Sequence, residues 1–223
     1  MNFVKLNYIA ISSVFAMILL SSLTVHLVSA SSTTVTDPAG DVKNNVFLWQ
    51  DIVGGSASKQ GSEFSFSMTL AGSLPSSPPL PEDTKALLWI VALDTDGSTF
   101  PAGYPFTKNS AKAFEYLVQL IWDGTTFVAL VIDRTPLLSG GEATLTLVPV
   151  SFSGDRATIS ILVSASLIGD PSSFAFFLAT ANRGAPIVQV ICCPTQVIPL
   201  PGNNGYQLLD RAPNPPSWAQ WPS

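Results

Sequence analysis

Residues 63–71 read EFSFSMTLA, and this stretch decides the fold class of the chain. Apolar side chains at positions 64, 66, 68 and 70 alternate with hydroxyl side chains at positions 65, 67 and 69. Because successive side chains of a β-strand point to opposite faces of a sheet, this period of two predicts an antiparallel strand with one buried face. Residues 51–59 form a second expected strand, which turns into the first through Gln60-Gly61-Ser62.

Similar strand signals continue along the chain. Residues 85–93 are apolar on both faces, which predicts a central strand that is covered on each side. Asp123-Gly124 and Gly154-Asp155 have the composition of hairpin turns. The strands expected around and after these turns cover residues 113–122, 126–133, 143–152, 156–164, 173–181 and 187–192.

About nine strands joined by short turns predict an all-β fold, a two-sheet antiparallel β-sandwich of jelly-roll-like type. We expect one sandwich domain over residues 31–200. Its proline-rich stretch SLPSSPPLPED, residues 73–83, is expected to be a polyproline-like surface loop, since proline cannot donate to a strand ladder. Residues 167–171 are expected to form a single helical turn, and the proline-rich tail 201–223 to pack on the sandwich or extend from it.

The first thirty residues have the pattern of a signal peptide, with Lys5, a long apolar stretch, and Val28-Ser29-Ala30 as a cleavage site. The alternative is an uncleaved amino-terminal anchor, because the apolar stretch is long for a signal peptide. Under either interpretation we expect an extracellular or cell-surface protein. The mature chain contains no further apolar stretch that we interpret as a transmembrane span.

Composition argues against several functions. The chain has 10 Lys and Arg residues against 15 Asp and Glu, a formal net charge of −5, and no basic cluster. A nucleic-acid partner is therefore not expected. The only histidine, His26, lies in the signal segment, so we expect no Ser-His-Asp triad, Cys-His pair or histidine-containing metal site. We expect a non-catalytic protein.

The two cysteines, Cys192 and Cys193, are adjacent in sequence. This spacing rules out a long-range disulfide within one chain. Three interpretations stay open: a strained vicinal disulfide, a link between two chains, and a pair of buried thiols in the apolar run that includes Ile191.

Several segments resemble, in their order, the DOMON-like β-sandwich superfamily of secreted prokaryotic proteins. This superfamily includes family 9 carbohydrate-binding modules and the C-terminal domain of glucodextranase-type enzymes. The segments are DPAGD at 37–41, FSFSMTLAG at 64–72, LWIVALDTDG at 88–97, FEYLVQLIWDG at 114–124, VSASLIGDPSSFAFFLATAN at 163–182 and LDRAPN at 209–214. The resemblance implies a jelly-roll-like sandwich outside the cell, often with bound calcium and often attached to larger surface proteins. This sequence shows no catalytic domain beside the module, so the resemblance supports no enzymatic role.

Asp94 and Asp96 follow the central strand two residues apart, and two such side chains point to the same face. The resemblance places Glu115 on a strand near this DTDG turn. Asp37, Asp41 and Asp51 form a second group or complete the first. Carboxylates this close repel one another, and Ca²⁺ binds six to eight oxygen ligands in flexible geometry. We therefore weigh a structural calcium site equally against solvated turn carboxylates.

Trp49, Trp218 and Trp221 are the candidate ligand-binding aromatics, because carbohydrate modules stack sugars on exposed rings. Trp218 and Trp221 either fold back to cap the sandwich or present a binding surface. The expected function is a secreted module that binds polysaccharide or a cell-surface protein. The alternative is a structural subunit of the cell envelope that self-assembles, since only 11% of the residues are charged.

Overall fold

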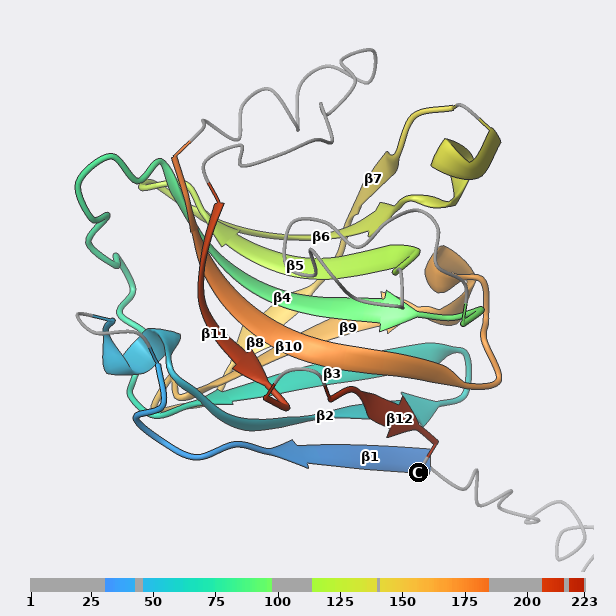
Figure 1. The fold of residues 1–223 in the computed structure, drawn as a ribbon, viewed down its shortest axis with the longest axis horizontal. Coiled ribbons are helices and arrows are strands. Elements are labelled where there is room, and N and C mark those ends of the chain that lie inside the picture. Colours follow the sequence, from blue (N-terminus) through green and yellow to red (C-terminus); the bar gives the residue numbers. More distant parts are fainter. Residues whose placement is uncertain are drawn as a thin grey trace, which may run out of the picture.

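A computed structural model shows an all-β protein in which two antiparallel sheets pack as a sandwich (Figure 1). The structure describes residues 31–42, 46–97, 114–139, 141–184, 206–214 and 217–222. The expected signal segment, the strand predicted at 187–192 and the Cys192-Cys193 pair lie outside these residues. No helix in the described ranges has the length and apolar character needed to cross a membrane.

The first sheet has five strands in the order β1-β2-β3-β9-β8. Their bounds are Ser31–Thr36 for β1, Ile52–Gln60 for β2, Glu63–Leu70 for β3, Thr158–Ser164 for β9 and Val150–Phe152 for β8. The alternation in EFSFSMTLA is confirmed, because Phe64 and Phe66 are buried while Ser65 and Ser67 lie on the outer face.

The second sheet has seven strands. Its order is β11-β10-β4-β5-β6-β7, and β12 also pairs with β10. The bounds are Tyr206–Ala212 for β11, Phe174–Arg183 for β10, Ala86–Asp94 for β4, Tyr116–Trp122 for β5, Phe127–Asp133 for β6, Thr144–Leu147 for β7 and Ala219–Trp221 for β12. Three short 3₁₀ helices connect strands: η1 at Leu48–Gln50, η2 at Thr135–Ser139 and η3 at Ala165–Ile168.

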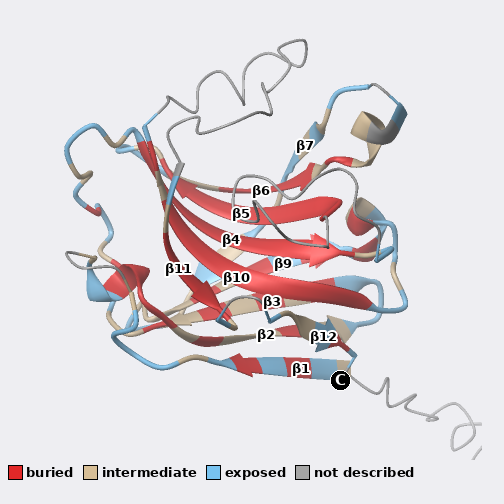
Figure 2. Cartoon of the chain, in the orientation of Figure 1, coloured by how far each residue is buried: buried red, intermediate tan, exposed pale blue. Residues whose placement is uncertain are grey.

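Strand β4 is the central strand that the sequence predicts. It lies between β10 and β5, and all nine of its residues are buried (Figure 2). One face of β4 contributes Trp89 to the core between the two sheets, where Phe64, Phe66, Phe174 and Trp221 also pack. The other face contributes to a second apolar cluster with Phe114 and Phe177.

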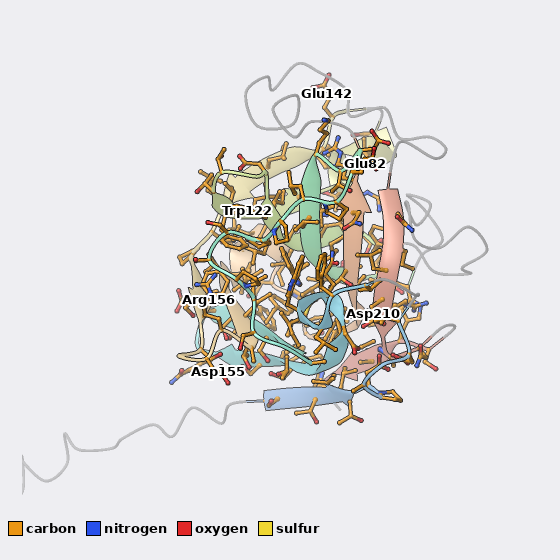
Figure 3. All side chains as sticks on the ribbon, turned by 90° about the vertical axis from the view of Figure 1, so that its left-hand side faces the viewer. Glu82, Trp122, Glu142, Asp155, Arg156 and Asp210 are labelled. Atoms are coloured by element: carbon orange, nitrogen blue, oxygen red, sulfur yellow. The ribbon has the colours of Figure 1, made fainter. Side chains whose placement is uncertain are left out.

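The proline-rich segment after β3 is attached to the sandwich near its start and at its middle. The Trp122 indole Nε1 donates to the carbonyl of Pro78 at 2.9 Å, and Arg156 Nε donates to the carbonyl of Leu74 at 2.7 Å (Figure 3). The Arg156 guanidinium also lies over the Phe152 ring at 4.2 Å. Side chains of the sandwich therefore satisfy the backbone carbonyls of Leu74 and Pro78.

The observed strands differ from the sequence prediction at three places. Residues 31–36, for which no strand was predicted, form β1 and pair with β2. The strand expected at 143–152 is divided at Pro149, so that β7 belongs to the seven-stranded sheet and β8 to the five-stranded sheet. Residues 206–212 and 219–221, which read as a proline-rich loop, form β11 and β12. Their pairing with β10 explains this outcome, since a long-range partner overrides weak local preference.

Candidate functional site

Two groups of carboxylates lie on the described part of the sandwich, and both were predicted in part. The first carboxylate site contains Asp37, Asp41, Asp51 and Asp210. One carboxylate oxygen from each of Asp37, Asp41 and Asp210 lies within 4.8 Å of the others. The second carboxylate site contains Asp94, Asp96 and Glu115. One carboxylate oxygen from each of these residues also lies within 4.8 Å of the others.

The two sites are well separated along the fold. Asp210 pairs with Thr180 on β10, whereas Asp94 pairs with Ala175 on the same strand. At about 3.3 Å per residue, five residues of strand correspond to roughly 17 Å. The six predicted carboxylates therefore form two groups, with Asp37, Asp41 and Asp51 in one and Asp94, Asp96 and Glu115 in the other.

Backbone N–H groups hold the carboxylates of the first site. The N–H of Gly40 donates to Asp51 Oδ2 at 2.8 Å, which closes the turn after β1 over Asp51. Asp210 receives two N–H groups, from Ile52 to Oδ2 at 2.5 Å and from Arg211 to Oδ1 at 2.7 Å. The carboxylates of Asp51 and Asp210 are thus oriented by main chain, and their remaining lone pairs are available to a ligand.

Two oxygens of the first site are buried without a hydrogen bond. These are Oδ1 of Asp51 and Oδ2 of Asp37. Asp51 has 0% of its surface exposed, so water does not solvate the orphan oxygen from outside. An unsatisfied buried carboxylate oxygen is unfavourable by several kcal/mol, roughly, unless a proton or a cation compensates it.

Within the described residues no lysine or arginine forms a salt bridge with the first site. Arg211 follows Asp210 directly, but its guanidinium donates to the carbonyl of Ser217 at 2.7 Å and lies over the Phe177 ring at 4.3 Å. The side-chain donor that does reach the site is neutral: Asn214 Nδ2 lies 2.7 Å from Asp41 Oδ2 and 3.3 Å from Asp37 Oδ1. Among the described side chains, the four acidic groups of the site therefore have one neutral amide as their hydrogen-bond donor.

This crowding changes the proton affinity of two carboxyl groups. Burial, followed by the charges of Asp41, Asp210 and Asp51, raises the pKa of Asp37 to about 7. Burial also raises the pKa of Asp210 to about 6, although its two backbone hydrogen bonds act in the opposite direction. Without a cation, the folded site retains protons at pH values where free aspartate is ionised.

The second site is built on the turn after β4. The N–H and Oγ1 of Thr95 donate to Glu115 Oε2 at 2.7 and 3.1 Å, and the N–H of Gly97 donates to Asp94 Oδ1 at 2.7 Å. Gly97 has a φ of +70°, the left-handed region that glycine adopts without strain. Glu115 is 2% exposed, and its Oε1 is buried without a hydrogen bond.

A cationic side chain accompanies the second site. Burial raises the pKa of Glu115, and the charges of Asp96 and Asp94 add to this effect. Buried Arg134 donates to the carbonyl of Phe114 at 2.7 Å; burial lowers its pKa to about 10, while Glu115 opposes that shift. The second site is therefore partly compensated, unlike the first.

Asp210 and Asn214 were not among the predicted site residues. They lie in LDRAPN, the last segment of the family resemblance. The local signal was weak, because Asp210 follows Leu208-Leu209 but is followed directly by Arg211, so the sequence alone suggests a neighbouring ion pair.

The predicted ligand-binding indoles are not on an open surface. Trp49 and Trp221 are buried and Trp218 is half-buried. Trp221 stacks on Phe174 with ring centroids 5.1 Å apart. Of the two interpretations of this residue, the structure supports the one in which the tail folds back and Trp221 caps the core. Trp49 is covered by Phe47, whose ring lies parallel to it at 4.7 Å and is itself 42% exposed.

No family model matches this sequence, and no curated protein matches it either. The candidate sites therefore depend on the geometry of this chain alone.

Proposed function

We propose that this chain is a secreted, non-catalytic β-sandwich module that holds calcium at the first carboxylate site and binds carbohydrate or another cell-surface ligand. The observation that supports the metal most directly is Asp51, a fully buried carboxylate with an orphan oxygen beside three other acidic side chains. A bound Ca²⁺, with its charge of +2, would offset part of this negative charge and would give the orphan oxygen a partner.

The donor set favours calcium among the common metals. The acidic side chains at the site offer carboxylate oxygens, and hard oxygen ligands suit Ca²⁺, whereas zinc sites use histidine and cysteine. Asp37, Asp41, Asp51 and Asp210 would be the ligands. Asp41 is exposed, so water would complete the six to eight ligands that Ca²⁺ prefers.

Isothermal titration of calcium into residues 31–223 tests this proposal. We expect a saturable binding event that disappears in Asp51→Asn and persists in Glu82→Gln, a matched loss of one exposed carboxylate elsewhere. Binding that is absent from the wild type, or unchanged in Asp51→Asn, would contradict the calcium site.

The ligand role is supported by the exposed ring of Phe47. The Phe47 ring stacks on Trp49 and forms an aromatic platform at η1. The 3₁₀ helix η1 is followed directly by Asp51. Aromatic faces of this kind bind sugar rings. A panel of immobilised polysaccharides should retain the wild type and release Phe47→Ala, while Leu147→Ala, which removes an exposed side chain from β7, should be retained.

The second candidate function is assembly into an envelope structure, and the outer face of the five-stranded sheet favours it. One row of residues across all five strands carries only hydroxyls, in the order Thr34, Ser56, Ser67, Ser160 and Ser151. Beside this row lies Leu162, an exposed apolar residue. A face with so little charge is suited to packing against a neighbour. Concentration-dependent mass in light scattering that is lost in Leu162→Lys would support assembly over ligand binding.

A further inference from the structure

The first carboxylate site joins two parts of the chain that are far apart in sequence. Asp37, Asp41 and Asp51 come from the segment between β1 and β2, whereas Asp210 comes from β11. The hydrogen bond from the N–H of Ile52 to Asp210 Oδ2 spans 158 positions and connects the five-stranded sheet to the seven-stranded sheet. Figure 3 shows Asp210 beside the η1 helix.

The strands β11 and β12, here called the C-terminal strands, lie at one margin of the seven-stranded sheet. Among the strands that the structure describes, β11 is the last in the sheet order, and its one partner there is β10. β12 pairs with β10 through Phe174, Ala175 and Phe176. An edge strand has ladder hydrogen bonds on one side, so its detachment breaks fewer of them than the detachment of a central strand.

We propose that the cation at the first carboxylate site holds the C-terminal strands on the sandwich, an inference that rests on the calcium site proposed above. Detachment of β11 moves Asp210 away from Asp37, Asp41 and Asp51. The bound cation then loses one of its carboxylates, and the site no longer exists in its folded form. Every detachment therefore competes with cation binding.

The size of the effect follows from linkage. A ligand that binds only the attached state reduces the population of the detached state by a factor of one plus the ratio of free ligand to Kd. At calcium equal to about one hundred times Kd, the reduction is about one hundredfold. Without the cation, repulsion among those carboxylates that are ionised favours detachment. The Asn214 amide, which donates to Asp41 and Asp37, opposes it.

Hydrogen exchange of residues 31–223, followed by mass spectrometry, tests the proposal. The probe is calcium alone, compared with EGTA. We expect exchange in peptides covering 206–214 and 217–222 to slow by up to about one hundredfold at saturating calcium. Peptides from β7 and β8, which lie on the opposite margin of the two sheets, should exchange at the same rate in both conditions.

Two variants complete the test. Asp41→Asn changes an exposed ligand, so the protein should fold, and most of the calcium-dependent slowing at 206–222 should be lost. Glu82→Gln, an exposed carboxylate outside the site, should retain it.

The outcomes separate the two proposals. If titration shows calcium binding at Asp51 but exchange at 206–222 is unchanged, or slows equally in every peptide, the cation site stands and its action on the C-terminal strands is wrong. If the wild type binds no calcium, both proposals fail.

Discussion

Asp210 on β11 accepts a hydrogen bond from the backbone N–H of Ile52, the first residue of β2, at 2.5 Å. This contact places a carboxylate of the seven-stranded sheet among the acidic residues that follow β1. The negative charge of the first carboxylate site determines how the stability of the protein is expected to respond to calcium and to pH.

Calcium removal should lower the melting temperature of residues 31–223. A ligand present at about one hundred times its Kd stabilises the folded state by about 2.7 kcal/mol. For a chain of this size, that corresponds to a change of roughly 5 to 10 °C. Differential scanning calorimetry with calcium and with EGTA measures the change. Asp51→Asn should melt at the same temperature in both buffers, and an equal shift in this variant would count against the site.

The cation-free protein should lose stability as the pH rises from about 4 to about 7. The folded pKa of Asp37 is raised to about 7 and that of Asp210 to about 6, so the folded state binds more protons than the unfolded chain over this range. The free energy of unfolding then decreases with increasing pH. Urea denaturation in EGTA at a series of pH values measures it, and saturating calcium should abolish the decrease. A cation-free stability that increases over this range would contradict the assigned charge crowding.

Trp221→Ala should destabilise the protein far more than Trp218→Ala. Trp221 is buried, stacks on Phe174 and meets Phe64 edge to face at 4.8 Å, so its removal leaves a cavity in the core. Losses of about 3 to 5 kcal/mol are typical for such a change. Trp218 is half-buried against Phe177 and should cost less. Chemical denaturation of both variants in calcium gives the comparison; equal losses would show that β12 does not contribute to the core.

Glu115→Gln should leave calcium affinity at the first carboxylate site unchanged. The two sites are roughly 17 Å apart along β10, and changes at such distances are usually additive. Isothermal titration of this variant beside Asp51→Asn measures independence. A large loss of affinity at the first site in Glu115→Gln would mean that the two groups are coupled.

Local patterns were sufficient for the interior of the sandwich and for parts of both sites. The alternation of β3 and the two-sided apolarity of β4 are visible within nine residues, because each strand is buried in a way that its own side chains specify. Asp94 and Asp96 were recognisable for a similar reason, since two residues of extended chain return a side chain to the same face.

Features that depend on a distant partner could not be predicted in this way. β11 and β12 are strands because β10 offers its edge to them, and the proline-rich sequence around them does not reveal that edge. Asp210 reaches Asp37 only after both sheets have assembled. Trp49 was predicted to be an exposed ligand-binding aromatic, but it is buried and Phe47 covers it.

The seam between β1 and β12 has a consequence for how the molecule is anchored. Thr33 Oγ1 donates to the carbonyl of Gln220 at 3.0 Å, and Trp221 Nε1 donates to the carbonyl of Ser31 at 3.4 Å. A tether attached at either Ser31 or Trp221 would therefore suspend the sandwich from the same corner. Six residues of β1, about 20 Å of extended chain, separate that corner from Asp37. Immobilised through either of these two residues, the protein would turn its first carboxylate site away from the supporting surface.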